Sequence, residues 1–163
     1  MVILGVDPGY AIVGYGVVHY ERSKFTPVRF GAITTPAGMA FEDRLHIIYD
    51  DMCQVIAKAK PDALAIEQLF FTTNQKTAID VAQARGVIVL AARQAGIEIY
   101  QYTPLQVKQS VVGYGKAEKK QVMEMTRILL GLEKVPRPDD TADALAIAIC
   151  HGHSAGSLLS RLR

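Results

Sequence analysis

Four carboxylates lie next to apolar runs, at positions where an ordinary solvent-exposed acid is not expected. Asp7 ends the apolar run VILGV, and Glu67 ends the apolar run ALAI. Asp140 and Asp143 are three residues apart and therefore share one face of a helix, and Asp143 leads directly into the apolar stretch ALAIAI. Burying a carboxylate is costly unless it is hydrogen-bonded, paired with a cation or bound to a metal. The four acids therefore call for an explanation.

Each of these acids also has a purely structural explanation. Asp7 could accept hydrogen bonds from the backbone of the Pro-Gly turn that follows it, and Glu67 could pair with a lysine or an arginine. Asp139 or Asp140 could cap the amino terminus of the last helix, where negative charge is favoured, and we assign that role to Asp139. Asp143 is the hardest to explain in this way, because it lies one turn further into the helix.

If the four carboxylates converge, their mutual repulsion raises their pKa values, and a divalent cation removes the conflict. Ligand sets made only of oxygen select hard ions, so Mg²⁺ is expected, with Mn²⁺ as a substitute. Four acids holding two such ions about 4 Å apart form a common device for phosphodiester hydrolysis. One ion lowers the pKa of the attacking water, and the other stabilises the leaving 3′ oxygen.

The elements that must position these acids alternate between strand and helix. Period-two patterns and short apolar runs predict strands at 2–7, 14–20, 27–34, 63–67 and 97–102. Helices are predicted over 40–60, over 75–95, from an N-cap at Thr103 with Pro104 and Gln106, around 122–129, and over 139–151. The first three strands form an antiparallel meander. The order predicts an α/β ribonuclease H-like fold with a five-stranded mixed sheet, flanked by about five helices; a flavodoxin-like fold is the weaker alternative.

Composition indicates one soluble domain over residues 1–163, with a loosely ordered tail over about 154–163. The chain is 50% hydrophobic and 21% charged, which is ordinary for a globular protein. Its two cysteines, Cys53 and Cys150, are interpreted as reduced core thiols, although a disulfide stays open. No secretory signal and no membrane-spanning run is present, so a cytoplasmic location is expected. The net charge is +2, and basic residues concentrate after residue 102, which is compatible with a polyanionic partner.

Five sequence blocks in this order are similar to the RuvC family of Holliday junction resolvases. They are GVDPG with GYGVV, AIEQLFF, QARGV, QVKQSVVGYGKAEKKQV and DDTADALAIAICH. The resemblance covers residues 2 to 153. It implies a ribonuclease H-like homodimer that cuts four-way DNA junctions in a Mg²⁺-dependent reaction during recombination and repair. Family members place paired symmetric nicks in two strands of like polarity, leaving ends that can be ligated, and work with the RuvA–RuvB branch-migration complex.

Carried over residue by residue, the resemblance assigns Asp7, Glu67, Asp140 and Asp143 as the catalytic and metal-binding acids. Asp140 is chosen over Asp139 because the family pattern places the third acid three residues before the last one.

The resemblance also assigns residues that bind DNA and residues that form a dimer. Lys108 and Lys119 match basic positions near the scissile and neighbouring phosphates, and Phe70 matches an aromatic that stacks on an unpaired base. Structural readings stay open for Lys119, as a lysine facing solvent in the first turn of a helix, and for Phe70, as a core residue. Lys116 and Lys120 extend the basic surface. The helix over 75–95 matches the family's dimer interface, with Ala78, Ala82, Arg85, Gly86 and Val89; packing within a monomer is the alternative.

Rival functions remain to be separated from this one. An actin-like ATPase or sugar kinase also opens with Asp-x-Gly on a strand, but 163 residues leave no room for its second domain. A junction-binding protein with an inactive site would retain four costly acids without need. A nuclease for RNA:DNA hybrids shares the acids but not the QARG and QVKQ blocks. The HGH motif of His151 and His153 is interpreted as a helix end rather than as a metal site.

Overall fold

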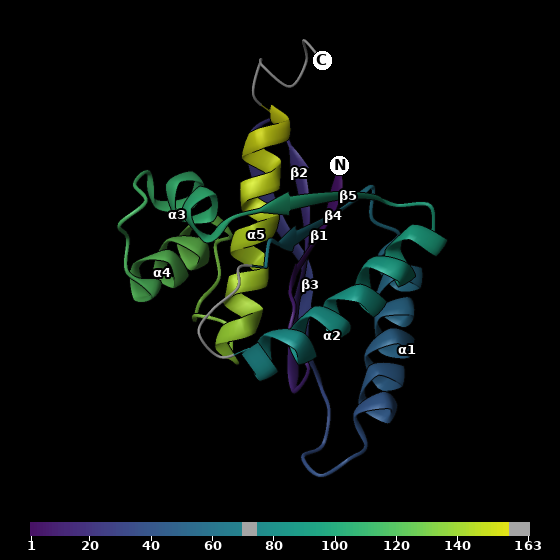
Figure 1. Cartoon of the computed structure of the whole chain (residues 1–163). Helices are drawn as coiled ribbons and strands as arrows, with labels where there is room; N and C mark the ends of the chain where they lie inside the picture. Colours follow the sequence, from purple (N-terminus) through teal and green to yellow (C-terminus); the bar gives the residue numbers. More distant parts are fainter. Residues whose placement is uncertain (70–74, 157–163) are drawn as a thin grey trace.

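The computed structural model describes residues 1–69 and 75–156 of the chain. Those residues form five strands and five helices, shown in Figure 1. The strands are β1 (Val2–Asp7), β2 (Ile12–Glu21), β3 (Lys24–Thr34), β4 (Ala63–Glu67) and β5 (Glu98–Tyr102). The helices are α1 (Phe41–Ala59), α2 (Gln75–Gln94), α3 (Pro104–Val112), α4 (Lys119–Leu129) and α5 (Asp139–Gly156).

The five strands form one mixed sheet in the order β3-β2-β1-β4-β5. The first three strands are antiparallel neighbours, whereas β4 runs parallel to β1 and β5 runs parallel to β4. In this register Asp7 lies opposite Gly14, and Val6 lies beside Ile66. Asp7 and Glu67, each one residue further along its strand, therefore end adjacent strands at the same edge of the sheet.

The sheet separates two hydrophobic cores, because successive strand residues point to opposite faces. Ile3 and Ala65 face α3, α4 and α5, whereas Leu4 and Leu64 face α1 and α2. Figure 1 shows the same division, with α1 and α2 together on one side and α3, α4 and α5 on the other. The middle of α5 is buried on all sides, as its continuous apolar sequence requires, since it lies between the sheet and the α3–α4 pair.

Glycines in the strands allow α5 to approach the sheet very closely. A Cβ at Gly5 would lie 2.1 Å from the carbonyl oxygen of Ala144, and one at Gly14 would lie 1.9 Å from the carbonyl oxygen of Asp140. Both distances are far below any real contact, so only glycine fits at these two places. The first turn of α5 therefore rests on the residue that pairs with Asp7.

The structure confirms the predicted fold class, and the predicted elements recur with small changes at their ends. The expected capping box at the start of α3 is present: the Thr103 hydroxyl accepts from the Gln106 backbone N–H, and the Gln106 side chain accepts from the Thr103 N–H. Both cysteines are free thiols.

One boundary prediction was wrong in part. Residues 154–156, expected to begin the loose tail, belong to α5, because the helix continues to Gly156. The rest of that tail, 157–163, lies outside the described residues. Among the described helices, none has the length and apolar character needed to span a membrane.

Candidate active site

The four acids predicted from the sequence come from three elements that meet at one edge of the sheet. Asp7 and Glu67 end β1 and β4, and Asp140 and Asp143 lie on the first turns of α5. All four side chains belong to half-buried residues. The close packing of α5 on Gly14 fixes the helix end above the strand ends, so that the acids lie in one electrostatic environment.

Asp7 is the most perturbed of the four. Burial, followed by the negative charges of Glu67, Asp143 and Asp140, raises its pKa from 3.8 to about 8, and only the nearby Lys119 acts in the opposite direction. Hydrogen bonds donated by the Pro-Gly turn would have lowered the pKa instead. The direction of the shift therefore argues against a role for Asp7 as a turn-stabilising carboxylate.

Glu67 and Asp143 are perturbed in the same direction. Burial, and then the charge of Asp143, raises the pKa of Glu67. Burial also raises the pKa of Asp143, although a salt bridge of 2.8 Å between the Lys119 Nζ and the Asp143 Oδ2 opposes the change. The hydrogen bond to Asp143 in turn raises the pKa of Lys119. One ammonium group thus partly compensates a surplus of negative charge.

Asp139 and Asp140, adjacent in sequence, have different surroundings. Asp139 forms an ion pair with Arg137 and lies 3.9 Å from the Lys119 ammonium. Asp140 is among the charges that raise the pKa of Asp7, whereas Asp139 is not. Both aspartates contribute to the raised pKa of Asp143. The choice of Asp140 over Asp139 therefore stays a prediction.

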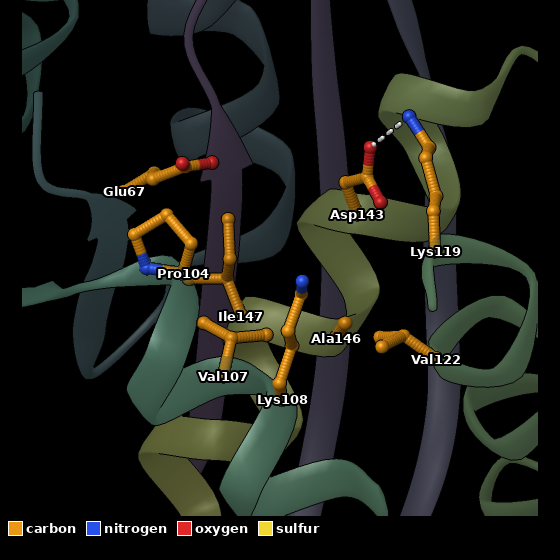
Figure 2. Close-up of a pocket in the computed structure, with 9 residues that line it drawn as sticks. All are labelled: Glu67, Pro104, Val107, Lys108, Lys119, Val122, Asp143, Ala146 and Ile147. Carbon is orange, nitrogen blue, oxygen red and sulfur yellow. Dashed lines mark ion pairs between the residues drawn. The ribbon is translucent and has the colours of Figure 1, made fainter. Parts of the chain in front are cut away.

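A cavity of about 270 Å³ is lined by two of the four acids, Glu67 and Asp143, whereas Asp7 and Asp140 are not among its lining residues. Figure 2 shows Glu67 on one side of it and Asp143 with Lys119 on the other, and the Lys108 side chain extends from α3 toward the space between them. Apolar residues of α3, α4 and α5 complete the wall: Pro104, Val107, Val122, Ala146 and Ile147. The cavity has carboxylates and ammonium groups at one end and hydrocarbon below them.

The chemistry of the acids fits a hard divalent cation. Their donors are all carboxylate oxygens, and the raised pKa of Asp7 shows that the cluster disfavours further negative charge when no cation is bound. Within the described residues, no three histidine, cysteine, aspartate or glutamate side chains are grouped closely enough to hold an ion as they stand. The acids thus match such an ion in the chemistry of their donors. The side chains of the described residues do not yet form a complete coordination geometry.

The remaining residues predicted to bind DNA are less closely associated with this site. Lys116, between α3 and α4, and Lys120, in the first turn of α4, are exposed and do not line the cavity. Phe70 lies outside the described residues, so the structure does not test its predicted role.

The residues predicted to form a dimer interface lie along α2, and they differ in exposure. Ala82 and Gly86 are exposed, and Ala78 and Val89 are half-buried. Two large apolar side chains of the same helix, Ile79 and Leu90, are 59% and 50% exposed. Arg85 differs from this group, because its guanidinium contacts the backbone oxygen of Glu67 and the side chain of Gln101.

The two histidines near the end of α5 have structural partners. The buried His151 shares a hydrogen bond of 2.7 Å with the hydroxyl of Tyr102, and His153 contacts Ser110 on α3. Both histidines therefore make contacts within the fold, and the interpretation of the HGH motif as a helix end stays a prediction.

Sequence reasoning missed the glycines that set the position of α5. Gly5 and Gly14 were considered only as parts of strands, although a glycine inside a strand often marks a close approach of another backbone. The spacing of glycines in GVDPG and GYG was the available signal.

The fold and the acid cluster together define a class of protein, the nucleases of ribonuclease H-like fold. Comparison with known proteins makes the class specific. The family described as "Crossover junction endodeoxyribonuclease RuvC" matches residues 3–151. The enzyme of that name from Ruminiclostridium cellulolyticum is 57% identical over 165 residues, covering 100% of this chain and 99% of its own length.

Solved structures agree with this result. The RuvC structure from Thermus thermophilus matches with a TM-score of 0.88 and 37% identity, covering 95% of each chain. A complex of T. thermophilus RuvC with a Holliday junction substrate matches with the same TM-score and coverage at 35% identity. The chain belongs to the RuvC family of crossover junction endodeoxyribonucleases, which are phosphodiester hydrolases. The function predicted from the sequence, Holliday junction resolution in DNA recombination and repair, is confirmed at the level of this family.

Proposed function

We propose that the chain resolves four-way DNA junctions as a homodimer, by Mg²⁺-dependent paired nicks in two strands of like polarity. Asp7, Glu67, Asp140 and Asp143 are the residues that would hold the ions, two in each active site, with Mn²⁺ as a substitute. The observation that carries this proposal is that a chain of this family bears carboxylates at the ends of β1 and β4 and on the first turns of α5, and that the charges of Glu67, Asp143 and Asp140 help to raise the pKa of Asp7. A cluster that resists its own negative charge is suited to bind cations.

The chain's own residues would prepare the site for a phosphodiester. Lys108 extends toward the space between Glu67 and Asp143 (Figure 2), where an ammonium can contact a phosphate oxygen and offset charge that develops during cleavage. Lys119 holds Asp143 by the 2.8 Å salt bridge, and so orients one of the acids. When bound, the ions lower the pKa of the attacking water and stabilise the leaving 3′ oxygen.

The substrate is proposed from the relative that was solved with a Holliday junction, and from the basic residues of this chain. Lys116 and Lys120 are exposed on the same side of the sheet as the cavity, where they would contact phosphates beyond the cut. Phe70, which follows Glu67 by three positions in the sequence, is proposed to stack on an unpaired base at the crossover.

The proposed dimer would use the outward face of α2. Ile79 and Leu90 expose apolar surface there, and a Cβ at Gly86 would meet nothing within 4 Å, so a second copy could approach closely. Two-fold symmetry would present two active sites to two symmetric strands, as paired nicking requires. A cytoplasmic location and cooperation with a RuvA–RuvB complex complete the proposal, and both rest on the family.

A cleavage assay tests this function. A mobile four-way junction, a linear duplex and an RNA:DNA hybrid are each incubated with the protein in Mg²⁺ or in EDTA, and both nicks are mapped. We expect symmetric nicks in the junction alone, and only with Mg²⁺. The Asp7→Asn variant should bind the junction without cutting it. Cleavage of the hybrid, or cleavage by the variant, would contradict the proposal.

A further inference from the structure

Arg85 has a double contact that neither catalysis nor dimer formation explains. This residue lies in the middle of α2, and its side chain turns toward the sheet. Its Nε donates to the main-chain oxygen of Glu67 at 3.3 Å, and its Nη2 donates to the Oε1 of Gln101 on β5 at 2.7 Å. The guanidinium of Arg85 thus connects α2 to the last residue of β4 and to β5.

The position of this contact matters because Glu67 is the last residue of its strand. The ladder between β4 and β5 ends there, with Glu67 beside Tyr102 and a final hydrogen bond from the Gln68 N–H to the Tyr102 oxygen. A strand end is held by fewer backbone hydrogen bonds than a strand centre, so a side chain that binds its last carbonyl restricts the end directly. The guanidinium is suited to this task, because its donors lie in a fixed planar fork.

Placing the charged guanidinium of Arg85 in a half-buried position also costs free energy, because the group loses part of its contact with water. Arg85 is half-buried, and partial burial lowers its pKa, since loss of water disfavours the charged form. If the side chain served only to fill space, an uncharged methionine at this position would avoid the free energy needed to desolvate a guanidinium. Its hydrogen-bonding partners instead lie at the base of one proposed metal ligand and on the strand beside it.

We propose that Arg85 is a positioning residue for the metal site, which holds the carboxyl end of β4 and thereby fixes the Glu67 carboxylate relative to Asp7. This inference rests on the proposed role of Glu67 as a metal ligand. Partners in the outer shell of metal sites commonly contribute about 10-fold to 100-fold to metal affinity, because they restrict where the ligand can point. Arg85 acts on the main chain of its ligand and through Gln101, not on the carboxylate itself.

The test measures binding of Mn²⁺ to the full-length protein by titration calorimetry in the absence of DNA, alongside junction cleavage. Arg85→Met retains the length of the side chain but removes its donors, and we expect it to weaken Mn²⁺ affinity about 10-fold or more. Arg85→Lys should recover part of the loss, because an ammonium can still reach one acceptor. Arg93→Met, which removes an exposed arginine from the last turn of the same helix, is the matched control and should bind Mn²⁺ like the unmodified protein.

Gln101→Leu provides a second, milder variant that tests the same contact if Arg85→Met does not fold. We expect it to weaken Mn²⁺ affinity about threefold, and to add nothing when combined with Arg85→Met, because both changes break one network. Junction affinity in EDTA and the oligomeric state should be the same for all variants. Unchanged Mn²⁺ affinity in Arg85→Met, or in Gln101→Leu when the first variant is unfolded, would overturn the inference.

Glu67→Gln separates this inference from the proposed function. If Glu67→Gln abolishes Mn²⁺ binding while Arg85→Met leaves it intact, the metal site stands and only the positioning role is wrong. If Glu67→Gln leaves Mn²⁺ binding intact, the proposed site is wrong and the inference is overturned with it. A loss of dimer in Arg85→Met with unchanged Mn²⁺ affinity would assign the residue to the dimer interface instead.

Discussion

Replacing Asp7 by asparagine should stabilise the metal-free protein, although it removes a proposed catalytic acid. In the folded chain the pKa of Asp7 is about 8, against 3.8 for an ordinary aspartate. Between these two values the folded state holds a proton that the unfolded chain releases, so the stability contributed by this group falls as the pH rises from about 4 to about 8. Asparagine has nearly the same shape as the protonated acid and carries no charge at any of these pH values.

The size of the effect follows from the shift. Each pKa unit corresponds to about 1.4 kcal/mol, so ionisation in the unfolded chain lowers the stability of the unmodified protein by up to about 4 kcal/mol at pH 7. The corresponding limit at pH 5 is about 1.5 kcal/mol. The half-buried carboxylate can move toward water, which makes both losses of stability smaller than these limits. We therefore expect Asp7→Asn to raise the free energy of unfolding by about 2 kcal/mol at pH 7 and by less than about 1 kcal/mol at pH 5.

Urea unfolding in EDTA at the two pH values measures this gain. Glu133→Gln, which removes an exposed carboxylate, is the control and should show no gain that grows with pH. Saturating Mg²⁺ should reduce or reverse the advantage of Asp7→Asn, because the ions stabilise only a protein that binds them. An Asp7→Asn variant no more stable than the unmodified protein at pH 7, or one with equal gains at both pH values, would refute the reasoning.

Four further predictions concern other residues. Gly14→Ala would place a Cβ 1.9 Å from the Asp140 carbonyl oxygen, so we expect a loss of about 3 kcal/mol or more in urea unfolding together with a loss of junction cleavage. Tyr102→Phe leaves the ring nitrogen of His151 without its partner and should cost about 1–3 kcal/mol by the same measurement. Because burial lowers the pKa of His151, the unfolded chain binds its proton more readily, and stability should fall as the pH drops below about 6.5 in pH-dependent unfolding. Lys119→Met removes the salt bridge to Asp143 and should slow cleavage at saturating junction about 10-fold, measured in single-turnover assays; an unchanged rate would mean that this contact has no catalytic role.

The sequence was sufficient to predict where β1 and β4 end and that each ends in an acid. The runs VILGV and ALAI are apolar up to the carboxylate, and burial of those runs brings Asp7 and Glu67 to the edge of the sheet. The spacing of Asp140 and Asp143 likewise determined which face of the last helix carries them. These features follow from local patterns, and the structure agrees with them.

The contacts that depend on packing between distant elements were not predictable in the same way. Arg85 was assigned to the dimer interface with its neighbours on α2, with packing within a monomer as the alternative, and its side chain contacts Glu67 and Gln101 of the same chain. The direction in which such an arginine points depends on hydrogen-bond acceptors on other elements. The positions of those acceptors in space cannot be read from one sequence. The pairing of Lys119 with Asp143 is another such case, since it joins residues of α4 and α5.

The acids are far apart in the chain, and this order has a consequence for the time at which the protein becomes able to cut. During synthesis, β1 and β4 emerge first and supply Asp7 and Glu67, but α5 follows every strand and brings the other two acids. The same helix covers the apolar face of the sheet. A partly synthesised chain therefore has neither a complete core on that face nor a complete set of carboxylates. Nuclease activity would thus be acquired only once α5 has packed on the sheet.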